Sequence, residues 1–344
     1  VLSSVGGFEL SADGKKLFYT SRGSYGIVDA KPGQSASEMD LSGLTMKIDP
    51  RAEWQSIFDD AWRIGRDWFY DPNMHGIDWQ AMKARYGALV PHVSHRSDLD
   101  LIFGEMIGEL EAGHTYGQRG DEPTVERVEG GMLGAELVAD ESGRYRIAKI
   151  FPGENWNDAY RSPLTEQGVE AQEGDFLLAI DGVELTTSQN PFELLEGKAE
   201  TQVVLTLNSS PSMTGARQET IRTIAHERDL RYLDWIKSRA ALVDELSDGQ
   251  IGYVHLPNTA QEGNEALQKF FYSQVSKPGL IIDDRYNGGG FIPDRMIEML
   301  SRTTLSYWAR RGIEPMTTPG FRHDGPKAML INGYAASGGD ALPY

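Results

Sequence analysis

The sequence predicts an α+β multidomain protein, and three patterns along the chain support this fold class. Apolar residues recur at every third or fourth position between residues 49 and 110, which is the period of amphipathic helices. Short apolar and alternating runs follow between residues 130 and 211, which is typical of strands. From residue 252 onward, strand-like runs alternate with helical ones, which favours an α/β core with a parallel sheet.

Composition excludes several classes of partner and site. The chain has 344 residues, enough for two or three domains, and its formal net charge of −18 opposes binding to nucleic acid, where Lys and Arg must neutralise phosphates. No apolar run approaches the roughly 20 residues that cross a bilayer, so we expect a soluble protein without membrane insertion. The lack of cysteine excludes a thiolate nucleophile and a cysteine-based zinc site, and it is compatible with the cytoplasm or the periplasm.

The first 40 residues contain a β-hairpin pattern. Two alternating runs between Phe8 and Thr20 are joined by Asp13-Gly14, a strong turn signal. An isolated hairpin is marginal in water. The succession of strand, SADGKKL turn and strand resembles a piece of a β-propeller blade, and this resemblance implies that residues 1–40 are the terminal strands of a partial β-propeller. A hairpin packed on the next domain is the alternative. Residues 31–45 are rich in Gly, Ser, Ala and Pro and indicate a linker.

Residues 45–125 are expected to be helical. The predicted helices begin at Asp49-Pro50, at Trp79 and at Ser97, and the third meets Gly113 as a C′ residue. His114 follows that glycine directly. His92 and His95 have the i, i+3 spacing of a possible metal-ligand pair, but no third ligand is evident in the sequence. We therefore expect no metal or cofactor.

Residues 128–212 predict a small β domain. Within it, Gly174-Asp-Phe-Leu-Leu-Ala-Ile-Asp-Gly182 resembles the strand and turn of PDZ domains. A PDZ fold has an open sheet edge that takes an extended peptide as an added strand. The resemblance therefore implies a peptide partner.

Residues 225–344 predict the α/β core. Buried-strand runs occupy residues 252–257, 279–283 and 328–331, and a helix is expected over residues 292–300.

Ser337 lies just after the last of these strand runs. The stretch Ala335-Ala-Ser-Gly-Gly339 is a G-x-S-x-G elbow with Ala in place of the first glycine, and the Gly338 N–H could hydrogen-bond an oxyanion. A serine nucleophile needs a base, and no histidine follows Ser337, so the base must precede it. His114 has the best context. The alternatives are an ordinary turn serine and a surface histidine at a helix end.

A glycine triplet follows the strand at residues 279–283. Gly288, Gly289 and Gly290 leave backbone N–H groups uncovered, which suits an anion or oxyanion site. Neither phosphate-binding glycine motif fits this stretch. A flexible turn is the alternative.

Four segments in this order resemble the C-terminal half of tricorn-type serine peptidases, in the tail-specific (C-terminal processing) protease superfamily. They are residues 111–116 (EAGHTY), the PDZ-like segment, residues 284–291 (DRYNGGGF) and residues 332–340 (NGYAASGGD). The resemblance implies the α/β core sheet of the tail-specific protease type, truncated at its C-terminus. It also implies Ser337 as nucleophile, His114 as general base, and the N–H groups of Gly338 and Gly290 as the oxyanion hole.

The resemblance further implies a serine peptidase that hydrolyses peptides or unfolded proteins, and a homo-oligomer in the full-length protein. The acidic residue that orients the histidine in this family lies well after the nucleophile, so we expect it beyond Tyr344. A different function stays open at this point. The chain could be a non-catalytic PDZ-type peptide-binding scaffold with a degenerate active site.

Overall fold

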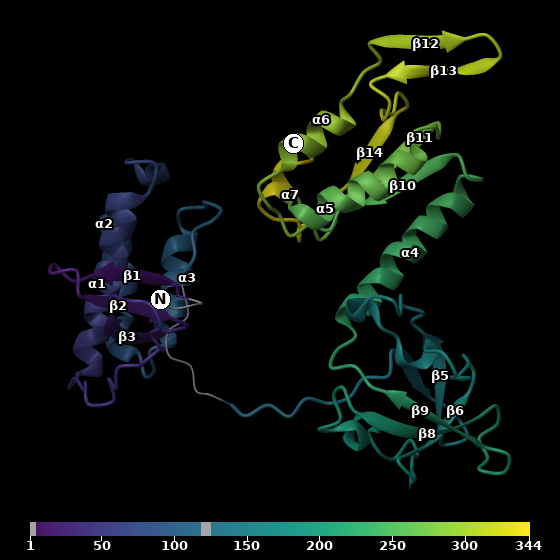
Figure 1. The fold of residues 1–344 in the computed structure, drawn as a ribbon, viewed down its shortest axis with the longest axis horizontal. Coiled ribbons are helices and arrows are strands. Elements are labelled where there is room, and N and C mark those ends of the chain that lie inside the picture. Colours follow the sequence, from purple (N-terminus) through teal and green to yellow (C-terminus); the bar gives the residue numbers. More distant parts are fainter. Residues whose placement is uncertain (1–4, 118–124) are drawn as a thin grey trace. The chain divides into compact units, whose positions relative to one another are not determined.

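The computed structural model describes residues 5–117 and 125–344. The chain divides into two compact units, Val1–Pro123 and Thr124–Tyr344, drawn in purple to blue and in teal to yellow (Figure 1). Within the described residues, the helices are all too short or too polar to cross a membrane.

The first unit begins with a three-stranded antiparallel sheet. Its strands are paired in the order β1 (Gly7–Leu10), β2 (Lys16–Ser21) and β3 (Ser24–Asp29). The predicted turn joins β1 to β2, and Gly14 has the positive φ, 71°, that this turn needs. Strand β3 is not predicted from the sequence, because SYGIVD begins directly after a second tight turn and contains a glycine. That this sheet belongs to a propeller stays a prediction.

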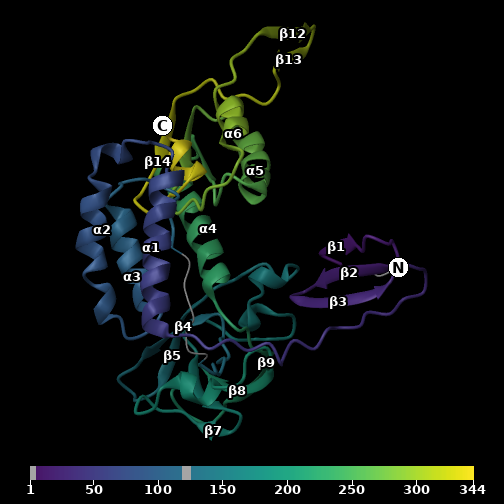
Figure 2. The same cartoon turned by 90° about the vertical axis from the view of Figure 1, so that its left-hand side faces the viewer.

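The predicted helical segment forms three mutually contacting helices (Figure 2). They are α1 (Pro50–Trp68), α2 (Trp79–Gly87) and α3 (Asp98–Gly108), with short 3₁₀ turns at Met74–Gly76 and Val90–His92. Asp49 caps α1 by accepting hydrogen bonds from the N–H groups of Arg51 and Ala52. The helices share an apolar core that includes Phe58, Trp62, Trp79, Leu99 and Met106.

Helix α3 ends earlier than the sequence predicts. It stops at Gly108 rather than next to Gly113. The N–H groups of Leu110 and Glu111 bond to the carbonyls three residues back, which tightens and ends the last turn. His114 therefore lies in an irregular loop after the helix.

The second unit begins with an antiparallel sheet in the PDZ-like region. Its path is β4-β5-β6-β8-β9, and β7 pairs with β6; the bounds are β4 (Ala135–Ala139), β5 (Tyr145–Ile150), β6 (Phe176–Ile180), β7 (Val183–Glu184), β8 (Gln202–Asn208) and β9 (Arg217–Arg222). At the predicted turn, Asp181 and Gly182 both have positive φ, 49° and 78°, as a two-residue hairpin turn requires. Strand β9 lies past residue 212, the predicted end of this domain. Its sequence RQETIR buries one apolar residue, Ile221, which leaves a weak strand pattern.

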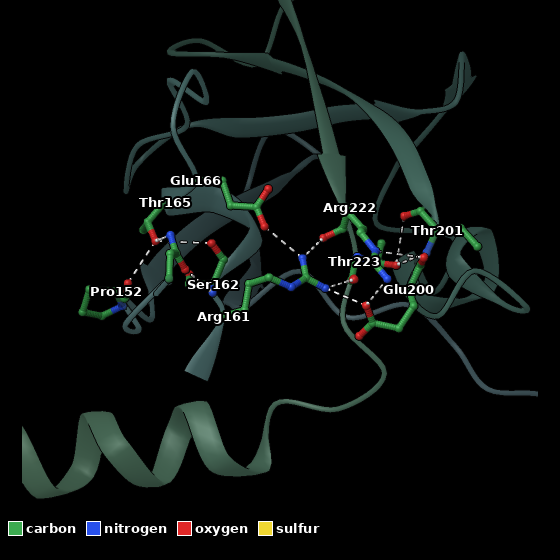
Figure 3. Close-up of polar contacts among 10 residues, drawn as sticks. Pro152, Arg161, Ser162, Thr165, Glu166, Glu200, Thr201, Arg222 and Thr223 are labelled. Atoms are coloured by element: carbon green, nitrogen blue, oxygen red, sulfur yellow. Dashed lines mark hydrogen bonds and ion pairs between the residues drawn. The ribbon is translucent and has the colours of Figure 1, made fainter. Parts of the chain in front are cut away.

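Arg161 ties together separate segments of this domain (Figure 3). Its guanidinium donates to the carboxylates of Glu166 and Glu200 at 2.9 and 2.8 Å. It also donates to the backbone carbonyls of Arg222 and Thr223 at 2.8 and 2.7 Å. The planar guanidinium can serve these four acceptors at once because its N–H groups diverge in one plane. The contacts fix the end of β9 against the loop that carries Arg161, between β5 and β6.

Helix α4 (Arg228–Leu246) leads from β9 to the α/β core and packs against its first strand. This helix is not predicted from the sequence. Leu230 is its buried residue, and most other positions are polar or half-exposed, so the apolar stripe is weak.

The α/β core contains a three-stranded parallel sheet, as predicted. Its strand order is β10 (Ile251–His255), β11 (Gly279–Asp283) and β14 (Lys327–Leu330), and its helices are α5 (Gln261–Ala266), α6 (Pro293–Leu300) and α7 (Gly338–Ala341), with π and 3₁₀ turns at Leu267–Phe271 and Tyr272–Gln274. Val254, Leu280, Ile282 and Met296 are among the residues that pack its core. An exposed antiparallel hairpin, β12 (Ser306–Arg310) and β13 (Ile313–Thr318), projects from the core and is not predicted (Figure 1).

Candidate active site

Three loops at the carboxyl edge of the parallel sheet form the candidate active site. One follows β10 and contains Thr259, one follows β11 and contains the glycine triplet, and one follows β14 and contains Ser337. Parallel strands end at the same edge, so loops far apart in sequence meet there. The sites of open α/β sheets commonly lie at this edge.

Ser337 occupies a strained turn between β14 and α7. Its backbone has φ 56° and ψ −122°, a conformation that residues with a side chain seldom adopt. The residue is exposed and directly precedes the buried Gly338 at the start of α7. The turn therefore has the strand-to-helix shape of a nucleophile elbow, with the serine at its apex.

The glycine triplet packs directly against this turn. A Cβ on Gly289 would lie 2.6 Å from Ser337 Cβ, and a Cβ on Gly338 would lie 3.2 Å from Gly290 N. Within residues 5–117 and 125–344, neither Gly290 N–H nor Gly338 N–H donates a hydrogen bond. The structure thus brings Ser337, Gly338 and Gly290 together, with two unpaired backbone donors beside the serine.

Asn287 connects the three loops. Its Oδ1 accepts a hydrogen bond from Gly289 N at 2.8 Å, and its backbone carbonyl accepts one from Ala336 N at 3.0 Å. Its Nδ2 donates to Leu256 O at 3.1 Å and to Asp284 Oδ1 at 2.8 Å. The side chain is fully buried, so these bonds are not exchanged with water. Asn287 therefore fixes the position of the glycine triplet relative to the turn that carries Ser337.

Asp284 is a buried carboxyl group next to Asn287. Burial raises its pKa to about 7, although the hydrogen bond from Asn287 opposes the shift, and the nearby charges of Asp283 and Asp340 add to it. Its Oδ2 is buried and has no hydrogen-bond partner within the described part of the chain. The neighbouring Asp283 behaves differently. Burial acts to raise its pKa too, but hydrogen bonds from Arg285 and Tyr253 outweigh burial and lower it.

Aromatic contacts link helix α4 to two of these loops. Trp235 on α4 makes edge contacts with the rings of His255 and Tyr286, and Tyr286 stacks on Tyr334 in the loop of Ser337. The Nε2 atom of His255 is hydrogen-bonded to the Tyr232 hydroxyl, and burial lowers the pKa of this histidine. The loops are thereby supported from the side of α4.

His114 lies in the first unit, in the loop after α3. It is exposed, with a φ of 62°, and its Nδ1 lies 3.3 Å from the Tyr116 hydroxyl, with the two rings edge to face. A cavity of about 460 Å³ opens beside it, lined mainly by apolar side chains that include Trp68, Trp79, Phe103 and Ile107. The histidine is therefore accessible and has one ring nitrogen near a hydroxyl.

Sequence reasoning alone misses Thr259, Asn287 and Asp284. Asn287 and Asp284 stand inside the motif DRYNGGGF, where the sequence signal points to the glycines. Thr259 belongs to a polar loop without a motif. Their burial at the sheet edge becomes visible only when the strands are assembled.

Three family models match the chain. They are described as Tricorn protease C1 domain over residues 50–108, Tricorn protease PDZ domain over residues 131–226, and Peptidase family S41 over residues 250–344.

Curated relatives are similar across nearly the whole chain. Tricorn protease homolog 1 of Streptomyces coelicolor is 33% identical over 97% of this chain and 32% of its own length. Tricorn protease of Thermoplasma volcanium is 27% identical over 98% of this chain and 32% of its own length. A crystal structure of the tricorn protease superposes with a TM-score of 0.83 at 26% identity, covering 98% of this chain and 33% of that one. The chain thus spans about a third of the length of these relatives.

Proposed function

The chain belongs to the tricorn protease family, and we propose that it carries the catalytic part of a serine peptidase acting on peptides or unfolded proteins. The observation that carries this proposal is Ser337 at the apex of a strained strand-to-helix turn, beside the unpaired N–H groups of Gly338 and Gly290. This arrangement is what acyl transfer by a serine requires.

In the proposed mechanism, His114 removes the proton of the Ser337 hydroxyl as the oxygen attacks the carbonyl carbon of the scissile peptide bond. The carbonyl π electrons move to oxygen, and the N–H groups of Gly338 and Gly290 hydrogen-bond the resulting oxyanion. The intermediate collapses when its C–N bond breaks, and His114 returns the proton to the leaving amine. Water then attacks the acyl-enzyme carbonyl as His114 takes its proton, the C–Oγ bond to Ser337 breaks, and His114 returns the proton to Ser337 Oγ.

The roles of the surrounding groups follow from their contacts. Asn287 orients the glycine triplet, so the Gly290 N–H meets the oxyanion without a rearrangement during the reaction. Each oxyanion donor is worth about 10²–10³ in rate in enzymes of this kind.

We propose further that the PDZ-like domain binds an extended segment of the substrate by adding it as a strand to the sheet, whose path ends at β4 and β9. The full-length protein is proposed to be a homo-oligomer. Analytical ultracentrifugation tests the second point, and a sedimentation coefficient of a monomer at micromolar concentration would contradict it.

The nucleophile is tested with a fluorophosphonate probe on the full-length protein. We expect covalent modification of Ser337, found by mass spectrometry, which disappears in Ser337→Ala and slows strongly in His114→Ala. Ser142→Ala is the matched control, since Ser142 is an exposed serine in the turn between β4 and β5. A folded protein that reacts equally with and without the Ser337 hydroxyl, or not at all, would support the peptide-binding scaffold instead.

A further inference from the structure

The backbone of Thr259 makes two hydrogen bonds with the loop that contains the glycine triplet. Its N–H donates to Gly289 O at 3.0 Å, and its carbonyl accepts from Ile292 N at 3.1 Å. A Cβ on Gly290 would lie 2.7 Å from the Thr259 carbonyl carbon, so the two backbones are in direct contact. Thr259 therefore packs directly against the backbone at Gly290.

The hydroxyl of Thr259 is buried without a hydrogen-bond partner. The residue has 0% exposure, and its Oγ1 finds no donor or acceptor in the part of the chain that the structure describes. Buried hydroxyl groups are nearly always hydrogen-bonded, so an exception calls for an explanation. A hydrogen-bond partner on the bound substrate would explain this exception.

The same hydroxyl points toward Gly338. A Cβ placed on Gly338 would overlap Thr259 Oγ1 and would lie 2.5 Å from Gly290 O and 3.2 Å from Gly290 N. One small region beside Gly338 is therefore approached both by the hydroxyl and by a backbone N–H of the proposed oxyanion hole. The absence of a side chain on Gly338 leaves this approach possible.

We propose that the Thr259 hydroxyl is a third hydrogen-bond donor to the oxyanion; this rests on the proposed peptidase function and extends it. When Ser337 Oγ bonds to the carbonyl carbon and the π electrons move to oxygen, Thr259 Oγ1–H donates to that oxygen. It transfers no proton, because His114 already holds the proton from Ser337. The contact strengthens as charge develops, so it acts on the chemical step more than on substrate binding.

The test compares Thr259→Val, which keeps the shape but removes the hydroxyl, with Thr259→Ser, which keeps the hydroxyl. We expect Val to lower kcat about 10²-fold with little change in KM, and Ser to stay within about threefold of the wild type. Thr20→Val is the control, since Thr20 is a half-buried threonine in β2 and belongs neither to the loops of the candidate active site nor to the PDZ-like domain. It should leave kcat unchanged even if it lowers the melting temperature.

The outcomes separate this proposal from the proposed function. A wild type that neither hydrolyses peptides nor reacts with the fluorophosphonate overturns both. An active wild type whose Val variant is equally active, or whose Ser variant is as slow as Val, overturns the role of Thr259 alone. If the Val variant does not fold, Thr259→Cys replaces it, because a thiol is a much weaker donor of similar size. Equal kcat values for the Ser and Cys variants would then contradict the proposal.

Discussion

Gly289 is the position at which a single added methyl group tests the architecture of the candidate site. Its φ is +82°, and a Cβ there would lie 2.6 Å from Ser337 Cβ and 2.7 Å from the Ala336 carbonyl oxygen. The left-handed backbone costs a residue with a side chain about 1–2 kcal/mol. Forcing a methyl group into a packed site costs about 1–3 kcal/mol more. Gly289→Ala should therefore destabilise the second unit by about 2–5 kcal/mol.

The adjacent Gly288 provides the control. Its φ is not in the left-handed region, and the nearest atom to a Cβ there is Pro257 O, at 3.9 Å. Gly288→Ala should change the free energy of unfolding by no more than about 0.5 kcal/mol. The two variants differ by one position in the same loop, so composition and chain flexibility are matched.

The assay is urea unfolding of the full-length protein, with hydrogen–deuterium exchange to localise the effect. Gly289→Ala should lower the urea midpoint and raise exchange in the peptides that cover residues 284–292 and 332–342. It should also slow fluorophosphonate labelling, because Ser337 must move away from the new methyl group. Equal stability and labelling for the two alanine variants would refute the packing of the triplet against the serine turn.

Three further changes test charges and caps. Because the folded pKa of Asp284, about 7, lies above its usual value of 3.8, stability present below about pH 4 should be lost as pH rises through 7. The free energy of unfolding falls by at most about 1.4 kcal/mol per pH unit. Asp284→Asn should therefore gain urea resistance over the wild type between pH 5 and pH 8. Identical dependence of the urea midpoint on pH in the two proteins would contradict this. Arg161→Ala should destabilise the PDZ-like domain by about 2 kcal/mol or more, since Glu166 and Glu200 lose a charged donor, and Arg161→Lys should restore only part of it. An Arg161→Lys variant that melts at the wild-type temperature would show that the planar guanidinium is not needed. Asp49→Ala should cost about 1 kcal/mol by uncapping α1, read from helical circular dichroism on melting, and an unchanged melt would contradict the cap.

Much of the secondary structure could be predicted because local patterns specify it. The three helices of the first unit follow the recurrence of apolar residues at three and four positions, and the strands of the parallel sheet follow short apolar runs. The Asp181-Gly182 turn is visible in the sequence because that pair readily adopts two successive positive φ angles.

Elements with a weak apolar signal escape prediction. Helix α4 is largely polar, β9 buries one apolar side chain, and the β12–β13 hairpin is exposed along its length. Their stability comes from pairing and from contacts with neighbouring elements rather than from local propensity. Such contacts join residues distant in the sequence, so no short stretch of sequence predicts them.

The sequence by itself determined which residues have the chemistry for acyl transfer: a serine among small residues, a histidine before it, and a glycine triplet. Only the tertiary structure decided which groups surround the serine. Thr259, Asn287 and Ser337 follow three different strands and meet because parallel strands end at one edge of the sheet. There burial leaves the Thr259 hydroxyl unpaired and raises the pKa of Asp284, and such effects depend on neighbours distant in sequence.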